Sequence, residues 1–264
     1  MKKSEICVIV SIIIFIFSLA YITSLGGLGY LPPVDVRKLA QIYLSSTYNP
    51  FEPTNTSSGY ESVTAIVWDF RGLDTFFETA VFYGAIIASI AVYRGVEIDT
   101  RKKPIGMSPI AKTVTRLSTV LIPTVAASIA FHGHLTPGGG FQAGSVATVV
   151  IVLIVMVFGL RKVILKGLTK PKILLLRSLG LIGIGLTAIG LVLAGLVIGV
   201  NAYIFQNQAK PIARISYPMW IDDILVGGSL LLFNLFEFIA VMAGFALVLM
   251  LFSIEEEEVR KVIK

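Results

Sequence analysis

The sequence predicts an all-α integral membrane protein, built as a bundle of about six transmembrane helices. Its 264 residues are 55% hydrophobic and only 14% charged, whereas about a quarter of the residues of a soluble domain carry a charge. The apolar residues fall in runs of about 20, the length that a helix needs to cross a hydrocarbon core about 30 Å thick. Lipid offers no partner for backbone N–H and C=O groups, so each run is expected to be helical. The predicted localisation is the cell membrane, with several crossings and the lipid bilayer as the surroundings.

The predicted spans are spread along the chain, at residues 6–25, 73–93, 114–131, 141–160, 174–200 and 224–252. The first run is longer than the apolar core of a signal peptide, so an uncleaved anchor is expected. The fifth run contains Gly195 and Gly199, a spacing that suits close approach of two helices. We therefore expect a helix interface there.

The basic residues predict that both termini are cytoplasmic. In that topology the outer side carries only Arg37, Lys38, Arg71, Lys210 and Arg214. All other Lys and Arg among the 22, Arg177 included, then lie on the cytoplasmic side, as the positive-inside rule requires. The net charge of +6 is thereby explained by topology and does not indicate a nucleic-acid partner.

A basic connection around residues 99–104 divides the chain into two predicted parts. Residues 1–100 hold two spans joined by a long outer connection, and residues 101–264 hold four spans. The outer connection includes a turn-rich stretch at residues 48–59, which we expect to be ordered only where a neighbouring protein holds it. No inverted pair of broken helices is seen in the sequence, which disfavours a self-contained transporter.

Three carboxylates in or beside the spans are the first candidates for an ion or proton path. Asp74 and Glu78 are spaced i, i+4 and share a helix face with Arg71. We expect Arg71 to pair with Asp74, which then has a structural or tuning role. Glu78 lies one turn deeper, where burial would let it exchange a proton near neutral pH. The alternative is a hydrated helix end with both acids in water.

Glu237 falls near the middle of the last predicted span, the costliest depth for a charge. Asn234, three residues earlier, is placed to hydrogen-bond to it. Two roles are open for Glu237. It takes part in proton transfer inside the bundle or at a neighbouring protein, or it is a protonated carboxyl that holds helices together.

The connection between the third and fourth spans carries the chain's two histidines, His132 and His134. Two histidines without cysteine or another ligand cluster predict no metal site. They are expected either to handle protons at the membrane edge or to fix a tight turn. Glycines after them permit a compact non-helical turn beside an aqueous path. The residues of this turn are Pro137, Gly138, Gly139, Gly140 and Phe141.

The run His-Gly-His-x-Thr-Pro-Gly-Gly-Gly-Phe-Gln-x-Gly at residues 132–144 resembles the signature of the MnhB (MrpB) family of Mrp-type multisubunit cation/proton antiporters. Four spans from about residue 114 match the size of that family, and residues 232–241 resemble its last helix. Glu237 stands there in place of the usual Asp, and the usual following Gly-Val is missing. Residues 70–78 resemble a motif near the C-terminal end of the large MrpA-type antiporter protein, and this segment is a separate small protein in archaeal membrane-bound hydrogenases.

The resemblance implies a subunit of an Mrp-like antiporter module that helps form the Na+ or H+ path, inside a larger complex such as a membrane-bound hydrogenase or sulfur reductase. The implied partners are membrane proteins of the MrpA, MrpC, MrpD, MrpE, MrpF and MrpG types, and a hydrogenase-like redox module. The sequence shows no redox cofactor motif, so no cofactor and no catalytic centre are expected here. Any enzymatic role would be that of a non-catalytic subunit of an ion-translocating oxidoreductase. The alternative is a structural scaffold with no direct role in ion transfer.

Overall fold

The computed structural model of the chain describes residues 3–27, 36–96, 107–254 and 259. It divides into two compact units, residues 1–42 and residues 43–264. The first unit contains α1 (Lys3–Ser24), an apolar helix long enough to cross a membrane. The predicted connection at 99–104, and with it the boundary at residue 100, lies outside the described residues and stays a prediction.

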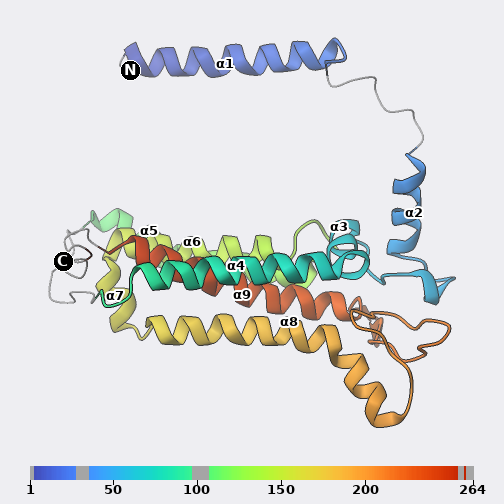
Figure 1. Ribbon diagram of the computed structural model, residues 1–264. Coiled ribbons are helices and arrows are strands. Elements are labelled where there is room, and N and C mark those ends of the chain that lie inside the picture. The colour runs from blue at the N-terminus through green and yellow to red at the C-terminus, as the bar shows by residue number, and fades with distance from the viewer. Residues whose placement is uncertain (1–2, 28–35, 97–106, 255–258, 260–264) are drawn as a thin grey trace. The chain divides into compact units, whose positions relative to one another are not determined.

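Six helices among the described residues are long and apolar enough to span a membrane, which confirms the predicted all-α membrane class. Besides α1 they are α4 (Gly72–Val92), α5 (Pro109–His132), α6 (Gly140–Phe158), α8 (Lys170–Ile198) and α9 (Ser229–Phe252). Helix α9 is central in the second unit, because α4, α5, α6 and α8 all contact it (Figure 1). The short helix α7 (Leu160–Leu165) joins α6 to α8.

Local signals set the ends of these helices. Ser108 caps α5, since its Oγ accepts the N–H of Ala111 at 3.2 Å, and Pro109 occupies the first turn. Helix α8 ends at Gly199, whose φ of 73° is left-handed, and the Val200 N–H bonds back to the Gly195 carbonyl at 2.9 Å. Gly195 and Gly199 thus form a helix end, and a helix interface with another protein at this place stays a prediction.

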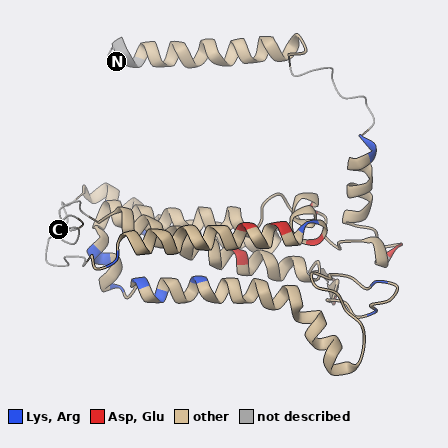
Figure 2. Ribbon diagram, viewed as in Figure 1, with Lys and Arg blue, Asp and Glu red and all other residues tan. Residues whose placement is uncertain are grey.

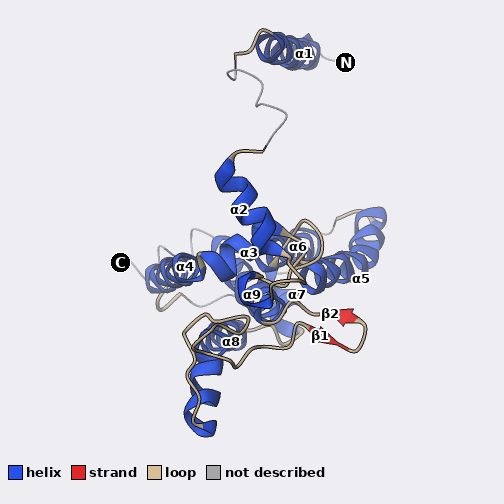
Figure 3. Cartoon of the chain, turned by 90° about the vertical axis from the view of Figure 1, so that its right-hand side faces the viewer, coloured by secondary structure: helices blue, strands red, loops and turns tan. Residues whose placement is uncertain are grey.

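The last span begins later than predicted. Ile224–Leu225 forms strand β2, which pairs antiparallel with β1 (Trp220–Ile221), and α9 starts only at Ser229. The apolar character of the sequence runs through both elements, so hydropathy alone could not separate a short strand from the helix that follows. Figure 3 shows this β-hairpin among the loops at one end of the helices.

Residues 43–71 are held by the chain itself. They include the end of α2 (Lys38–Thr47), the 3-10 turn η1 (Pro53–Asn55), α3 (Ser62–Ala65) and the π-helical turn η2 (Ile66–Phe70). Asn207 Nδ2 donates to the Ser57 carbonyl at 2.7 Å, and the Tyr60 N–H donates to the His134 carbonyl at 2.8 Å. The expectation that a neighbouring protein must order this stretch is thus wrong.

The second unit has two chemically different ends. The hairpin end comprises residues 53–71, 132–140 and 200–228, and the α7 end comprises residues 159–169 with the last turns of α4 and α9. The described Lys and Arg gather mostly near the α7 end (Figure 2). This asymmetry agrees with the charge pattern of the sequence, while the orientation of the chain in the membrane stays a prediction.

Candidate functional site

Glu237 lies buried inside the second unit, 7% exposed, on α9. Two N–H groups point at its carboxylate. The Trp68 indole Nε1 donates to Oε2 at 3.2 Å, and the backbone N–H of Phe141 also donates to the carboxylate. Within the described residues Glu237 makes no ion pair. A carboxylate held by neutral donors alone can bind a proton or a small cation without first breaking an ion pair.

The glycine-rich turn before α6 brings backbone up to this carboxylate. A Cβ on Gly140 would lie 2.5 Å from the Asn234 carbonyl oxygen and 2.8 Å from Glu237 Oε2, so only glycine fits there. The N–H of Gly140 donates to Asn234 Oδ1 at 3.2 Å. The first turn of α6 therefore points its free N–H groups and the positive end of its dipole at Asn234 and Glu237. The expected bond between Asn234 and Glu237 is replaced by this bond to Gly140, and the buried Asn234 Nδ2 has no hydrogen-bond partner among the described residues.

Trp68 reaches Glu237 because the chain forms a π-helical turn at Ile66–Phe70. Such turns are rare and frequently occur at functional sites. The Trp68 ring stacks on Phe233 with centroids 4.4 Å apart and is only 1% exposed. Trp68 was not among the predicted site residues, and the only signal in the sequence is its place just before the Arg71–Glu78 motif. Its contact with Glu237 joins residues 169 positions apart.

The two histidines have different surroundings. His132 is exposed at the end of α5, and its Nδ1 lies 2.9 Å from the Ser128 carbonyl. His134 is 2% exposed, and its Nε2 donates to the Leu225 carbonyl at 2.8 Å, while Nδ1 has no hydrogen-bond partner in the part of the chain that the structure describes. Burial lowers the pKa of His134, so the neutral ring is favoured. His134 therefore ties the glycine-rich turn to the β-hairpin, and its role in proton transfer remains a prediction.

The predicted pair at the start of α4 is present. Arg71 and Asp74 form an ion pair of 2.6 Å, with both side chains more than half exposed. Glu78 is also exposed, in a shallow groove beside Phe77 and Val81. The expected burial of Glu78 is therefore not provided by this chain. An acid on an apolar helix face suits contact with another membrane protein or with a water-filled path.

Arg177 is a further buried charge that the sequence analysis misplaced. It was expected among the basic residues of the cytoplasmic side, but it is 0% exposed inside α8. Its Nη1 donates to the Ala240 carbonyl at 2.7 Å, and Nε and Nη2 have no hydrogen-bond partner within the described residues. The available signal was its position, because residue 177 falls inside the predicted span that starts at 174.

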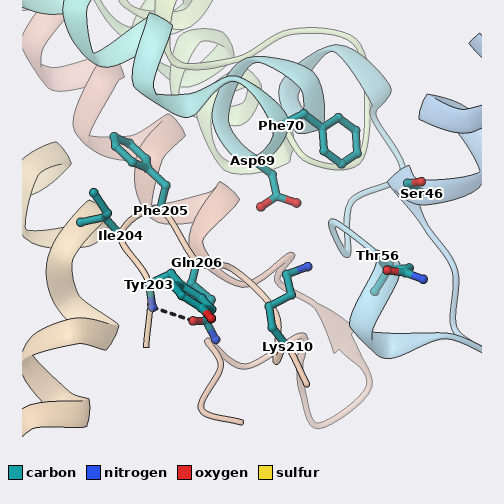
Figure 4. Close-up of a pocket in the computed structure, with 10 residues that line it drawn as sticks. Ser46, Thr56, Asp69, Phe70, Tyr203, Ile204, Phe205, Gln206 and Lys210 are labelled. Atoms are coloured by element: carbon teal, nitrogen blue, oxygen red, sulfur yellow. Dashed lines mark hydrogen bonds between the residues drawn. The ribbon is translucent and has the colours of Figure 1, made fainter. Parts of the chain in front are cut away.

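A pocket of about 330 Å³ opens at the hairpin end (Figure 4). Asp69 and Lys210 lie on opposite sides of it, and Tyr203 and Phe205 lie to one side of the space between them. The Ser57 hydroxyl donates to Asp69 Oδ2 at 2.6 Å. Burial raises the pKa of Asp69, while the Ser57 bond and the positive charge of Lys210 oppose that rise. Asp69 follows Trp68 directly, so the π-helical turn places one side chain on Glu237 and the next in the pocket.

The part of the chain that the structure describes contains no group of three His, Cys, Asp or Glu side chains that could hold a metal ion. The candidate site thus consists of one buried carboxylate, its N–H donors and a glycine-rich turn. Such a site can exchange a proton or hold a monovalent cation, but it offers no nucleophile–base pair for covalent chemistry.

Known proteins that resemble this chain indicate its family and its fold. An uncharacterized protein of Methanocaldococcus jannaschii is 25% identical over 175 residues, which cover 60% of this chain and 60% of that protein. A chain of the membrane-bound sulfane sulfur reductase, an archaeal respiratory membrane complex, is 23% identical with a TM-score of 0.63, covering 97% of this chain and 100% of that chain.

A chain of the Mrp complex from a Dietzia species is 17% identical with a TM-score of 0.55, covering 97% of this chain and 26% of that chain. Both structural likenesses concern the fold. A family described as "Domain related to MnhB subunit of Na+/H+ antiporter" matches residues 110–247. The match includes the glycine-rich turn and Glu237 but not residues 70–78, so the likeness of that segment to the MrpA-type protein stays a prediction. With more than half of its residues in the match, the chain belongs to the family of the MnhB-related domain.

Proposed function

We propose that this chain is a membrane subunit of an Mrp-like cation/proton antiporter module and that it helps form the Na+ or H+ path. Membership of the MnhB-related family supports the module, and the fold shared with a chain of a sulfane sulfur reductase complex supports a larger respiratory-type assembly. Its partners in this proposal are other Mrp-like membrane subunits, with a hydrogenase-like or sulfur-reducing redox module beyond them.

The observation that carries the proposal is the surroundings of Glu237. A buried carboxylate on α9 that has N–H donors, and no cation in contact among the described residues, is costly to keep charged. Proteins place such groups in membranes mainly where a proton or ion is handled. Glu237 therefore replaces Glu78 as the best candidate, because Glu78 is exposed on this chain while Glu237 is enclosed by α6, α9 and the π-helical turn.

The test is Na+-dependent proton transport in membrane vesicles that carry the whole complex, comparing the wild type with Glu237→Gln. Glutamine keeps the size of the side chain and can still accept from Trp68, but it cannot bind a proton reversibly. We expect transport to fall to background while the complex stays intact on a native gel. Glu78→Gln in the same vesicles shows whether the exposed acid contributes as well.

Undiminished transport in an intact Glu237→Gln complex would contradict the proposal and leave this chain as a scaffold. Loss of assembly alone would favour the same alternative, with Glu237 serving as a contact between helices.

A further inference from the structure

Arg177 lies sealed between three helices, where an unpaired charge is expensive. Its guanidinium carbon is 4.5 Å from the Phe82 ring centroid and 5.6 Å from that of Tyr83, both on α4. Nη1 donates to the Ala240 carbonyl on α9. The Arg177 guanidinium on α8 therefore contacts α4 through the faces of two aromatic rings and α9 through a backbone carbonyl oxygen.

Helix α9 is shaped to receive this side chain. A Cβ on Gly244 would collide with Arg177 Nη1 and would lie 2.7 Å from Ile86 Cδ1 of α4. Any larger residue at 244 would thus push the guanidinium away from both α4 and α9. The guanidinium of Arg177 thus fills a space between α4, α8 and α9 that exists because residue 244 is glycine.

Glu78 and Glu237 each lie shortly before a residue that Arg177 contacts. Glu78 is four residues before Phe82 on α4, and Glu237 is three residues before Ala240 on α9, about one helical turn in each case. Helices α4 and α9 contact each other, so the two acids lie on neighbouring helices. Like charges on neighbouring helices repel each other, and more strongly where the local dielectric constant is low.

We propose that Arg177 is a positioning residue that clamps α4 to α9 and offsets the repulsion between Glu78 and Glu237. Its positive charge one turn beyond both acids attracts each of them, and its bonds fix the register of the two helices that carry them. The clamp stands on the contacts alone, whereas its consequence for ion transfer rests on the proposed function.

The test measures contact between α4 and α9 directly, without transport. In the assembled complex, Cys7 is replaced by Ser, and cysteines are placed at Ile86 and Leu247, which share one buried apolar cluster. The yield of the oxidative cross-link is compared for Arg177, Arg177→Lys and Arg177→Met, each with Glu78 and with Glu78→Gln. Methionine fills the space without charge, and lysine keeps the charge without the planar group.

We expect Arg177→Met to lower the cross-link yield severalfold in the presence of Glu78, and Arg177→Lys to keep most of it. In the Glu78→Gln background, where the repulsion is absent, the effect of Arg177→Met should largely disappear. If Arg177→Met prevents accumulation of the complex, recovery of the complex by Glu78→Gln is the measurement, with the same expectation.

An equal loss in both backgrounds would overturn the proposal, because the effect of Arg177 would then not depend on the charge of Glu78. An unchanged yield in Arg177→Met would overturn it as well. Failure of Glu237→Gln to affect transport would remove the proposed ion path but leave this result untouched, so the two ideas fail separately.

Discussion

The two ends of the second unit bury different kinds of side chain. At the α7 end a cluster of aliphatic side chains closes the bundle, and its members are Ile86, Val163, Ile173, Ala243, Ala246, Leu247 and Met250. At the hairpin end the buried residues are largely polar and hydrogen-bonded, and Asn234 at the start of α9 joins them. The side chains of Thr64, His134, Gln206 and Asn207 bond to backbone, and that of Ser57 bonds to Asp69. An apolar cluster tolerates changes of shape that keep its volume. A buried hydrogen-bond network does not, because each lost partner leaves an unsatisfied group.

The difference explains why the candidate site lies where it does. A carboxylate needs donors in fixed positions, and only the hairpin end supplies them near Glu237. The α7 end supplies a closed apolar layer beyond Arg177, which keeps water from that side of the bundle. The hairpin end should therefore respond strongly to small changes in its chemistry, and the α7 end should not.

The largest effect is expected from Gly140→Ala, which places a methyl group against the Asn234 carbonyl and the Glu237 carboxylate. Overpacking of this kind costs about 1–3 kcal/mol, and here the obstacle includes backbone. The melting temperature of the purified complex, read by scanning fluorimetry in detergent, should fall and transport should be lost with it.

Gly185→Ala on α8 is the matched control, because nothing lies within 4 Å of the added Cβ. Its better helix propensity should leave stability unchanged or raise it by up to about 1 kcal/mol. Equal behaviour of the two alanine variants would contradict the tight contact described for Gly140.

The local features of this site were predictable from sequence, and its long-range contacts were not. The Arg71–Asp74 pair follows from a spacing of three residues, and the unusual turn at Gly140 follows from the glycine run. The bond from Trp68 to Glu237 depends on how distant segments pack, which no local pattern encodes. For the same reason the sequence could place Arg177 and Glu78 within helices but could not say which of the two faces inward.

The span boundaries show the same limit. Five of the predicted spans agree with helices to within a few residues, because length and apolar character are set by the bilayer. The sixth was extended over β2, since strand and helix residues are equally apolar there. The ordering of residues 43–71 was missed because their partners, such as Asn207, come much later in the chain.

A smaller effect is expected from pH on stability, and it should differ between the two histidines. The pKa of His134 is lowered by burial, so the unfolded chain binds the extra proton more readily than the folded chain. Stability from this residue is therefore fully present above the unfolded-state pKa of about 6.5 and falls as the pH drops below it. The loss is up to about 1.4 kcal/mol per pH unit until the folded-state pKa is reached.

His134→Gln should flatten this dependence in melting temperatures measured between pH values of about 7.5 and 5.5, which bracket the ordinary histidine pKa. His132→Gln should leave it in place because His132 is exposed. The raised pKa of Asp69 acts the other way, since it favours the folded chain as the pH falls. Asp69 is present in both histidine variants, so its effect cancels when their melting temperatures are compared at each pH. A His132→Gln profile as flat as that of His134→Gln would argue against a special role for the buried ring.

The smallest effect is expected at the exposed ion pair of Arg71 and Asp74, which belongs to neither the polar network nor the apolar layer. Exposed pairs contribute about 0–1 kcal/mol, because water and salt screen them. Asp74→Asn should thus shift the melting temperature only slightly, and the shift should vanish at high salt. Transport should persist, since Asp74 is expected to tune the helix start and not to carry the ion. Loss of transport in an intact Asp74→Asn complex would instead place this acid on the path, and the exposed face of α4 would then join the hairpin end as a second sensitive region.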